Sequence, residues 1–386
     1  MSNIITVFFI TVHILPFLFI RAGHSLASFL FVIYIFTAYL LGWYMARIFS
    51  NQNQQKSNMI SFTKCRSHSL IAVASAYLLL RVPYVTEIFQ AFVSGDFATY
   101  ALQRAKARYS GESMGFIYNI GTVMFICFLG LAGTYIGIYQ QNIVKAYKRD
   151  KSKQSVLLIL SLIVLMILVE SSSLARAGVV MALTVFFANY LYAKRIDFQN
   201  IAYPKLMIFG AKITFFMLLI FYFSAYFRLS DNADVAALLI EKTYVYFIGP
   251  HESFSTWLSR SHESLFTSYG YNTFTSVFKL LGVTTQQGHY DKFVDSQTNI
   301  FLLYRGLLQD FGLILTGVIV IGLSYLANYS DAYLHRLPGL VIAAKASVCM
   351  LLFLFISPFI FTTFLVGFVL SNVLQKTVYK RVQYPC

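Results

Sequence analysis

Long apolar segments recur along the whole chain, each of roughly 16 to 22 residues, the length that crosses about 30 Å of hydrocarbon as an α-helix. Of the 386 residues, 58% are hydrophobic and 12% are charged, a balance that would expose a large apolar surface in water. The sequence therefore predicts a single integral membrane domain over residues 1–386, an all-α bundle of about ten transmembrane helices. The predicted spans are Ile4–Ile20, Leu26–Met45, Leu70–Phe89, Gly115–Tyr139, Val156–Val169, Ala177–Ala193, Leu206–Phe227, Phe311–Leu326, Leu340–Ile356 and Phe359–Leu374.

Basic residues gather in alternate loops between these spans. Lys and Arg are concentrated in residues 56–66, 145–153, 194–205 and 376–381, which fall on one side of the membrane if all ten spans are real. The positive-inside rule makes that side the cytoplasm and puts both termini there. Topology thus accounts for much of the formal net charge of +15, and no nucleic-acid partner is expected. The first span has no Lys or Arg before it, so we interpret it as a retained helix.

Two of the remaining loops are long enough to matter for function. Arg228–Asp310 is predicted to be a large outward-facing segment, and residues 90–114 a smaller one. Within the larger segment, Val235–Phe247 and Tyr269–Gly282 have the mixture of aromatic and polar residues typical of short amphipathic helices at a membrane surface. We expect the functional site to lie there.

Sequence motifs of common soluble enzymes are missing. The chain has no P-loop, no GxGxxG after a strand, no GxSxG, no Cys or His pairs at zinc spacing, and no Asp-x-Asp pair that would hold a metal on a nucleotide sugar. The sequence therefore predicts no cofactor and no metal, and it gives no support to ATP-driven transport or zinc-dependent hydrolysis.

Arginines stand instead at the predicted outer ends of several spans. A guanidinium near the hydrocarbon boundary snorkels, pairs with an acid, or binds an anionic headgroup, and its planar fork suits phosphate. In Thr298–Gly312, TNIFLLYRGLLQDFG, Arg305 and Asp310 would lie about 140° apart on a helix, so they are not expected to pair with each other. The arginines concerned are Arg81, Arg104, Arg108, Arg176, Arg228, Arg260 and Arg305.

Three segments together resemble the bacterial oligosaccharide repeat unit polymerases, the O-antigen polymerase or Wzy-type family. They are SSSLARAG at Ser171–Gly178, YGYNTFTSVFKLLG at Tyr269–Gly282, and TNIFLLYRGLLQDFG at Thr298–Gly312. The resemblance implies an enzyme on the periplasmic face of the bacterial inner membrane. Such enzymes transfer a growing glycan from undecaprenyl diphosphate to a new undecaprenyl-diphosphate-linked repeat unit, without metal or nucleotide sugar. A chain-length regulator and a flippase are the implied protein partners, with membrane lipid around the chain.

This reaction has a diphosphate leaving group and an acceptor hydroxyl, and each needs its own residues. Arginines suit the developing charge of the diphosphate, and a proton acceptor must serve the hydroxyl. The predicted base is His289, in QGHYD, with Asp310 as the second candidate; His251, His262, Asp291 and Asp295 are further titratable residues of the same outer segment. The predicted diphosphate ligands are Arg176, Arg228 and Arg305, followed by Arg104 and Arg108.

Two alternatives stay open at the level of sequence. An O-antigen ligase would use the same donor but hand the glycan to lipid A core. A flippase or transporter for the lipid-linked sugar would need polar residues through the middle of its helices. Charges in the middle of the predicted spans are few, and the other polar residues crowd toward the outer side, which favours a one-sided enzyme.

Overall fold

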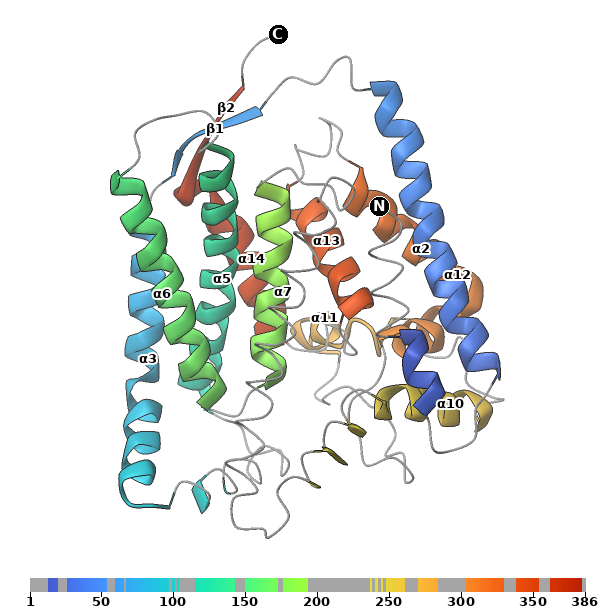
Figure 1. Ribbon diagram of the computed structural model, residues 1–386, viewed down its shortest axis with the longest axis horizontal. Coiled ribbons are helices and arrows are strands. Elements are labelled where there is room, and N and C mark those ends of the chain that lie inside the picture. Colours follow the sequence, from blue (N-terminus) through green and yellow to red (C-terminus); the bar gives the residue numbers. More distant parts are fainter. Residues whose placement is uncertain are drawn as a thin grey trace. The chain divides into compact units, whose positions relative to one another are not determined.

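The computed structural model describes most of the helices but not every connecting segment. The described residues are 13–19, 26–53, 60–65, 67–96, 99–100, 103, 115–142, 150–172, 176–193, 237, 240–241, 244–245, 248–260, 270–283, 303–329, 338–353 and 362–383. They belong to two compact units (Figure 1). Unit 1 comprises Met1–Ser57, Ile196–Tyr203 and Glu241–Leu365, and unit 2 comprises Asn58–Arg195, Pro204–Ile240 and Val366–Cys386.

The described part of the chain is predominantly helical, and most of its long helices are apolar. Four of them are long and apolar enough to cross a membrane: Leu26–Phe49, His68–Val93, Phe116–Tyr139 and Arg305–Asn328. Shorter apolar helices cover Gln154–Glu170, Gly178–Ala193, Gly339–Val348 and Thr362–Gln375. These eight coincide with eight of the predicted spans and are consistent with a helical membrane protein.

The other two predicted spans have different outcomes. Ile4–Ile20 was predicted to be an α-helix, but its described residues 13–19 form a π turn followed by the 3-10 helix η2 (Leu15–Phe19). Pro16 lies inside this segment and has no backbone N–H to donate, which disfavours a regular α-helix there. The predicted span Leu206–Phe227 lies outside the described residues.

Unit 2 contains the helices that pack most closely on one another. Figure 1 shows them side by side, with α5 next to α7. Gly133 of α5 lies directly against the backbone carbonyl of Phe186 in α7, where any Cβ would clash. Small residues at such contacts let two membrane helices approach closely. The helices of this unit are α3 (His68–Val93), α5 (Phe116–Asn142), α6 (Asp150–Ser172), α7 (Arg176–Ala193) and the main part of α14 (Thr362–Val378).

A short strand pair in unit 2 departs from the all-α prediction. Strand β1 (Ile60–Cys65) pairs antiparallel with β2 (Tyr379–Gln383), with Lys64 opposite Lys380 and Phe62 opposite Arg381. The first strand precedes α3 and the second follows α14 (Figure 1). Both belong to the basic segments that the charge pattern assigned to the same side of the membrane, and the pairing brings these segments together.

Unit 1 is built around α12 (Leu303–Asn328), which packs along α2 (Leu26–Asn53) and against α13 (Pro338–Phe353). Gly312 interrupts α12 with φ 63° and ψ −174°, a backbone conformation that glycine adopts readily. Side-chain donors bond backbone carbonyls on both sides of this break. Thr316 donates to the carbonyl of Leu307 at 2.9 Å, and Tyr34 of α2 donates to that of Leu313 at 3.0 Å.

The break divides α12 into a short first segment and a longer apolar one. The predicted span Phe311–Leu326 begins at this break, so the sequence located the apolar segment correctly. The first segment contacts α10 (Gly249–Arg260) and the turn that precedes α11 (Thr275–Leu280), both of which belong to the predicted outer segment. Tyr269–Gly282 was predicted to be an amphipathic helix, and its described residues, 270–282, form a turn followed by α11. The predicted helix Val235–Phe247 lies mostly outside the described residues.

Candidate functional site

Arg305 lies in the first turn of α12 and is fully buried. The Cζ atom of its guanidinium is 4.9 Å from the centroid of the Trp257 ring in α10. Trp257 is itself buried, at 3% exposed. An indole face attracts a cation through the negative side of its quadrupole, and the attraction grows when both groups are out of water. The ring therefore orients the guanidinium through its flat face.

Asp310 lies in the same segment of α12 and contacts a different part of the unit. One carboxylate oxygen accepts hydrogen bonds from the backbone N–H of Asn272 at 3.1 Å and from its side-chain Nδ2 at 3.2 Å. The other accepts from the backbone N–H of Thr273 at 2.6 Å. Hydrogen bonds to a charged acceptor are stronger than neutral ones. Asp310 thus fastens the turn that precedes α11 to the beginning of α12.

The residues that follow Asp310 complete this attachment. Phe311 packs edge-on against Phe274, with ring centroids 6.3 Å apart and planes at 67°. Gly312 then supplies the break in α12. The Asp-Phe-Gly triplet consequently joins two segments that sequence analysis had singled out separately, Tyr269–Gly282 and Thr298–Gly312.

His251, one of the loop histidines, is buried inside unit 1. Its ring centroid lies 5.6 Å from that of His13 and 5.6 Å from that of Phe17 in η2. Ser255, one helical turn further along α10, receives a hydrogen bond from Ser28 of α2 at 3.1 Å. These contacts hold α10 against η2 and α2, and they place His251 in a packed interior.

Several predicted site residues lie where the structure gives no side-chain geometry. Arg176 is the first residue of α7, but its side chain is outside the described set. Arg305 and Asp310 are therefore the two predicted site residues whose side chains the structure describes. The residues Arg104, Arg108, Arg228 and His289 lie outside the described ranges.

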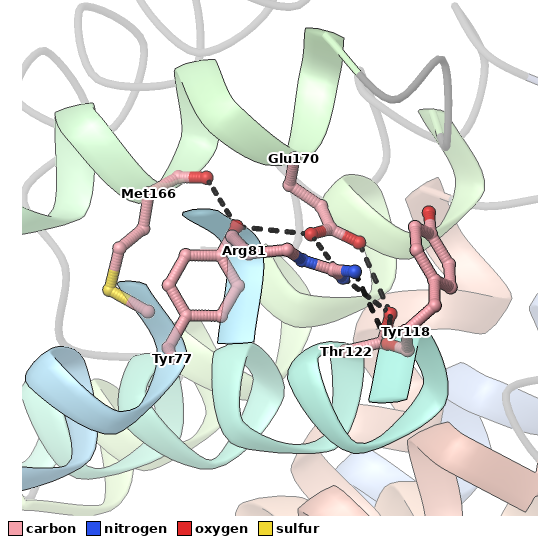
Figure 2. A network of polar contacts seen from close by, with 6 residues as sticks. All are labelled: Tyr77, Arg81, Tyr118, Thr122, Met166 and Glu170. Atoms are coloured by element: carbon pink, nitrogen blue, oxygen red, sulfur yellow. Dashed lines mark hydrogen bonds and ion pairs between the residues drawn. The ribbon is translucent and has the colours of Figure 1, made fainter. Parts of the chain in front are cut away.

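Unit 2 contains a second buried arginine, Arg81 of α3 (Figure 2). Its Nη2 atom lies 2.7 Å from the Oε2 atom of Glu170 in α6, a buried ion pair. The same nitrogen donates to Thr122 Oγ1 of α5 at 2.8 Å, and Nη1 donates to the Tyr118 carbonyl at 3.2 Å. Arg81 thus connects three helices at one point.

Tyrosines surround this ion pair. Tyr77 donates to Glu170 Oε2 at 3.1 Å and lies close enough to the Met166 carbonyl for a second hydrogen bond (Figure 2). The Arg81 guanidinium lies 4.1 Å from the ring centroid of Tyr118 and 5.5 Å from that of Tyr77. A buried charge that is paired and hydrogen-bonded in this way holds its helices in one register.

Sequence reasoning missed Glu170 and Trp257 as partners of the two buried arginines. A signal for Glu170 existed, because an acid at the predicted outer end of one span needs a partner, and Arg81 stands in a neighbouring span. Trp257 offered no such signal, since the contact depends on how α10 packs. Within the described ranges, no group of three or more His, Cys, Asp or Glu residues is arranged to hold a metal ion.

Comparison of the chain with known proteins returned no matching family model, no matching curated protein and no matching solved structure.

Proposed function

We propose that the chain is a metal-independent membrane glycosyltransferase that joins undecaprenyl-diphosphate-linked repeat units into a polysaccharide, either O-antigen or a capsular or exopolysaccharide. In this proposal the protein has ten spans in the bacterial inner membrane, both termini in the cytoplasm, and its site in the periplasmic segment 228–310 and the beginning of α12. The support comes from residues of this chain: the three segments that resemble the polymerase family, and the burial of Arg305 within one of them.

The observation that supports the proposal best is the environment of the Arg305 side chain, which is buried against Trp257. A fully buried guanidinium lies against Trp257 at the start of an apolar helix, beside a turn fastened by Asp310. A cation held there suits a lipid diphosphate, whose charge grows as the glycosidic bond breaks. Preorganised donors at such a point contribute to the rate because they need no reorganisation during the reaction.

The proposed reaction uses only groups of the protein and the two lipid-linked substrates. The acceptor hydroxyl oxygen attacks the anomeric carbon of the donor glycan, and the bond from that carbon to the diphosphate oxygen breaks. The diphosphate keeps the electron pair and is bound by Arg305. The sequence alone predicts Arg176 and Arg228, followed by Arg104 and Arg108, as its other ligands. The hydroxyl proton passes to a base.

His289 is our choice for that base. Asp310, the second candidate, has both carboxylate oxygens engaged by N–H donors of Asn272 and Thr273. The proposal therefore gives Asp310 the task of fastening the turn at Asn272 and Thr273.

The test is a pair of substitutions at Arg305 in a strain that lacks the chromosomal copy. Arg305→Ala should leave the protein inserted and abundant but lower the rate by roughly a hundredfold, since one charge-assisted contact made mainly in the transition state contributes on the order of 3 kcal/mol. Arg305→Lys keeps the charge without the planar fork and should recover only part of the activity. The readout is the polysaccharide ladder on a gel, with protein level measured in the same membranes.

The product pattern separates the proposal from its alternatives. Loss of a polymerase leaves lipid A core carrying single repeat units, loss of a ligase leaves long polymer on the carrier lipid, and loss of a flippase leaves repeat units on the cytoplasmic side. A normal ladder from a well-expressed Arg305→Ala protein would remove Arg305 from the site and contradict the proposal.

A further inference from the structure

Gln309 has a buried hydrogen-bond acceptor that the structure leaves unused. Among the residues that the structure describes, its Oε1 atom is buried and has no hydrogen-bond partner. Buried side-chain oxygens in proteins are nearly always hydrogen-bonded, so an exception of this kind calls for a physical explanation. A ligand that supplies the missing donor is one such explanation.

The position of Gln309 favours a ligand. It follows Arg305 by four residues in the first segment of α12, before the break at Gly312. Residues four apart on a helix share a face, with their Cβ atoms about 5 to 6 Å apart. The side chains of Arg305 and Gln309 therefore start from the same face of the helix. Asp310, one position further, makes its hydrogen bonds to Asn272 and Thr273.

This combination fits a ligand with an anionic group beside a hydrogen-bond donor. A guanidinium binds phosphate oxygens, whereas an amide oxygen accepts from a hydroxyl or an N–H group. A sugar attached to a diphosphate presents both within the reach of two neighbouring side chains. A bare diphosphate at neutral pH presents the anionic group without the sugar donor.

We propose that Gln309 is a substrate-binding residue that accepts a hydrogen bond from the sugar directly attached to the diphosphate. The inference rests on the proposed function, because it takes Arg305 as the ligand of that diphosphate. It adds a contact that distinguishes the glycan-bearing carrier lipid from the carrier lipid released after transfer. Such a contact favours binding of the donor over retention of the product.

The experiment measures binding of two probes to the purified full-length protein in lipid nanodiscs. One probe is undecaprenyl diphosphate, and the other is the lipid-linked repeat unit extracted from a strain that lacks this protein. The variants are Gln309→Ala, Arg305→Ala and Asn328→Ala. Asn328 is the matched control, since it is an amide at the far end of the same helix whose Oδ1 atom is also buried without a partner among the described residues. Thermal melting of each variant checks that it is folded.

Gln309→Ala should weaken binding of the repeat unit by about fivefold to tenfold, the effect of one neutral hydrogen bond, and leave binding of undecaprenyl diphosphate unchanged. Arg305→Ala should weaken both probes, and Asn328→Ala neither. Equal affinity of Gln309→Ala and the unmodified protein for the repeat unit would overturn the inference, as would equal weakening of both probes. If Gln309→Ala acts as expected but Arg305→Ala changes neither probe, the sugar contact stands and the diphosphate assignment of the proposed function fails.

Discussion

Two arginines of this chain are buried to nearly the same extent and yet have different surroundings. Arg81 is 1% exposed and Arg305 is 0% exposed, and each lies on a long apolar helix. Arg81 meets the carboxylate of Glu170 at 2.7 Å and gives hydrogen bonds to α5. Arg305 meets the face of Trp257, beside the turn that Asp310 fastens.

The difference shows that burial of an arginine does not by itself indicate a ligand site. An arginine neutralised by an acid of its own chain connects helices, and its removal leaves that acid buried without a counter-charge. An aromatic face orients a guanidinium through the negative side of its quadrupole. The comparison therefore supports a structural role for Arg81, whereas the binding role of Arg305 is part of the proposed function.

The largest effect on stability is expected at the ion pair between Arg81 and Glu170. Arg81→Ala should lower the free energy of unfolding by about 3 to 5 kcal/mol, because Glu170 would stay buried without its partner. The measurement is thermal melting of the detergent-purified protein, together with its level in membranes. Arg305→Ala is the matched substitution and should leave both quantities near those of the unmodified protein.

A double substitution sharpens the structural assignment of Arg81. Replacing a buried ion pair by apolar residues of similar volume is often neutral or stabilising, so Arg81→Met combined with Glu170→Met should recover most of the stability lost in either single variant. If the double variant folds normally but loses polymerisation, Arg81 has a role in the reaction and the division between the two arginines is wrong.

Substitution of Asp310 should have an intermediate effect on stability, confined to one part of unit 1. Asp310→Asn removes the charge from three hydrogen bonds and should destabilise the attachment of residues 270–283 by about 1.5 to 3 kcal/mol. Hydrogen-exchange mass spectrometry should then show faster amide exchange in that segment, with α5 and α7 unaffected. Asp96→Asn, at an exposed position after α3, is the control and should alter neither. Unchanged exchange in 270–283 would mean that Asp310 does not fasten this turn.

Sequence patterns predicted the apolar helices well because length and hydrophobicity are local properties. Eight predicted spans coincide with helices, including Phe311–Leu326, whose beginning falls at the break in α12. The prediction for Ile4–Ile20 was wrong over residues 13–19, where hydrophobicity was given more weight than the effect of Pro16 on helix geometry. The strand pair was missed because β1 and β2 are far apart in sequence, and short basic segments carry little strand signal.

The candidate site was predictable only in part, for a physical reason. Arg305 and Asp310 stood out because charges beside an apolar span are costly, and that cost is visible in sequence. Their partners depend on the packing of distant segments: Trp257 lies within α10, and the N–H groups of Asn272 and Thr273 belong to a turn before α11. The roles of Arg104, Arg108, Arg176, Arg228 and His289 stay predictions.

The smallest effect is expected at Trp257, and it tests whether the aromatic face matters to Arg305. Trp257→Phe keeps a smaller face and should slow the proposed polymerisation about twofold to fivefold, in line with cation–π energies of about 0.5 to 1 kcal/mol. Trp257→Leu removes the face and should slow it further, by up to about thirtyfold, with the energy for a desolvated pair near 2 kcal/mol. The chain has two tryptophans, and Trp43 of α2 is the matched control. The Cζ atom of Arg47 lies 5.9 Å from the centroid of the Trp43 ring, so Trp43→Leu should leave the rate unchanged.

In an Arg305→Ala background, Trp257→Leu should have no additional effect on the rate, because the ring would have no guanidinium to orient. Additive losses in that double variant would show that Trp257 acts independently of Arg305.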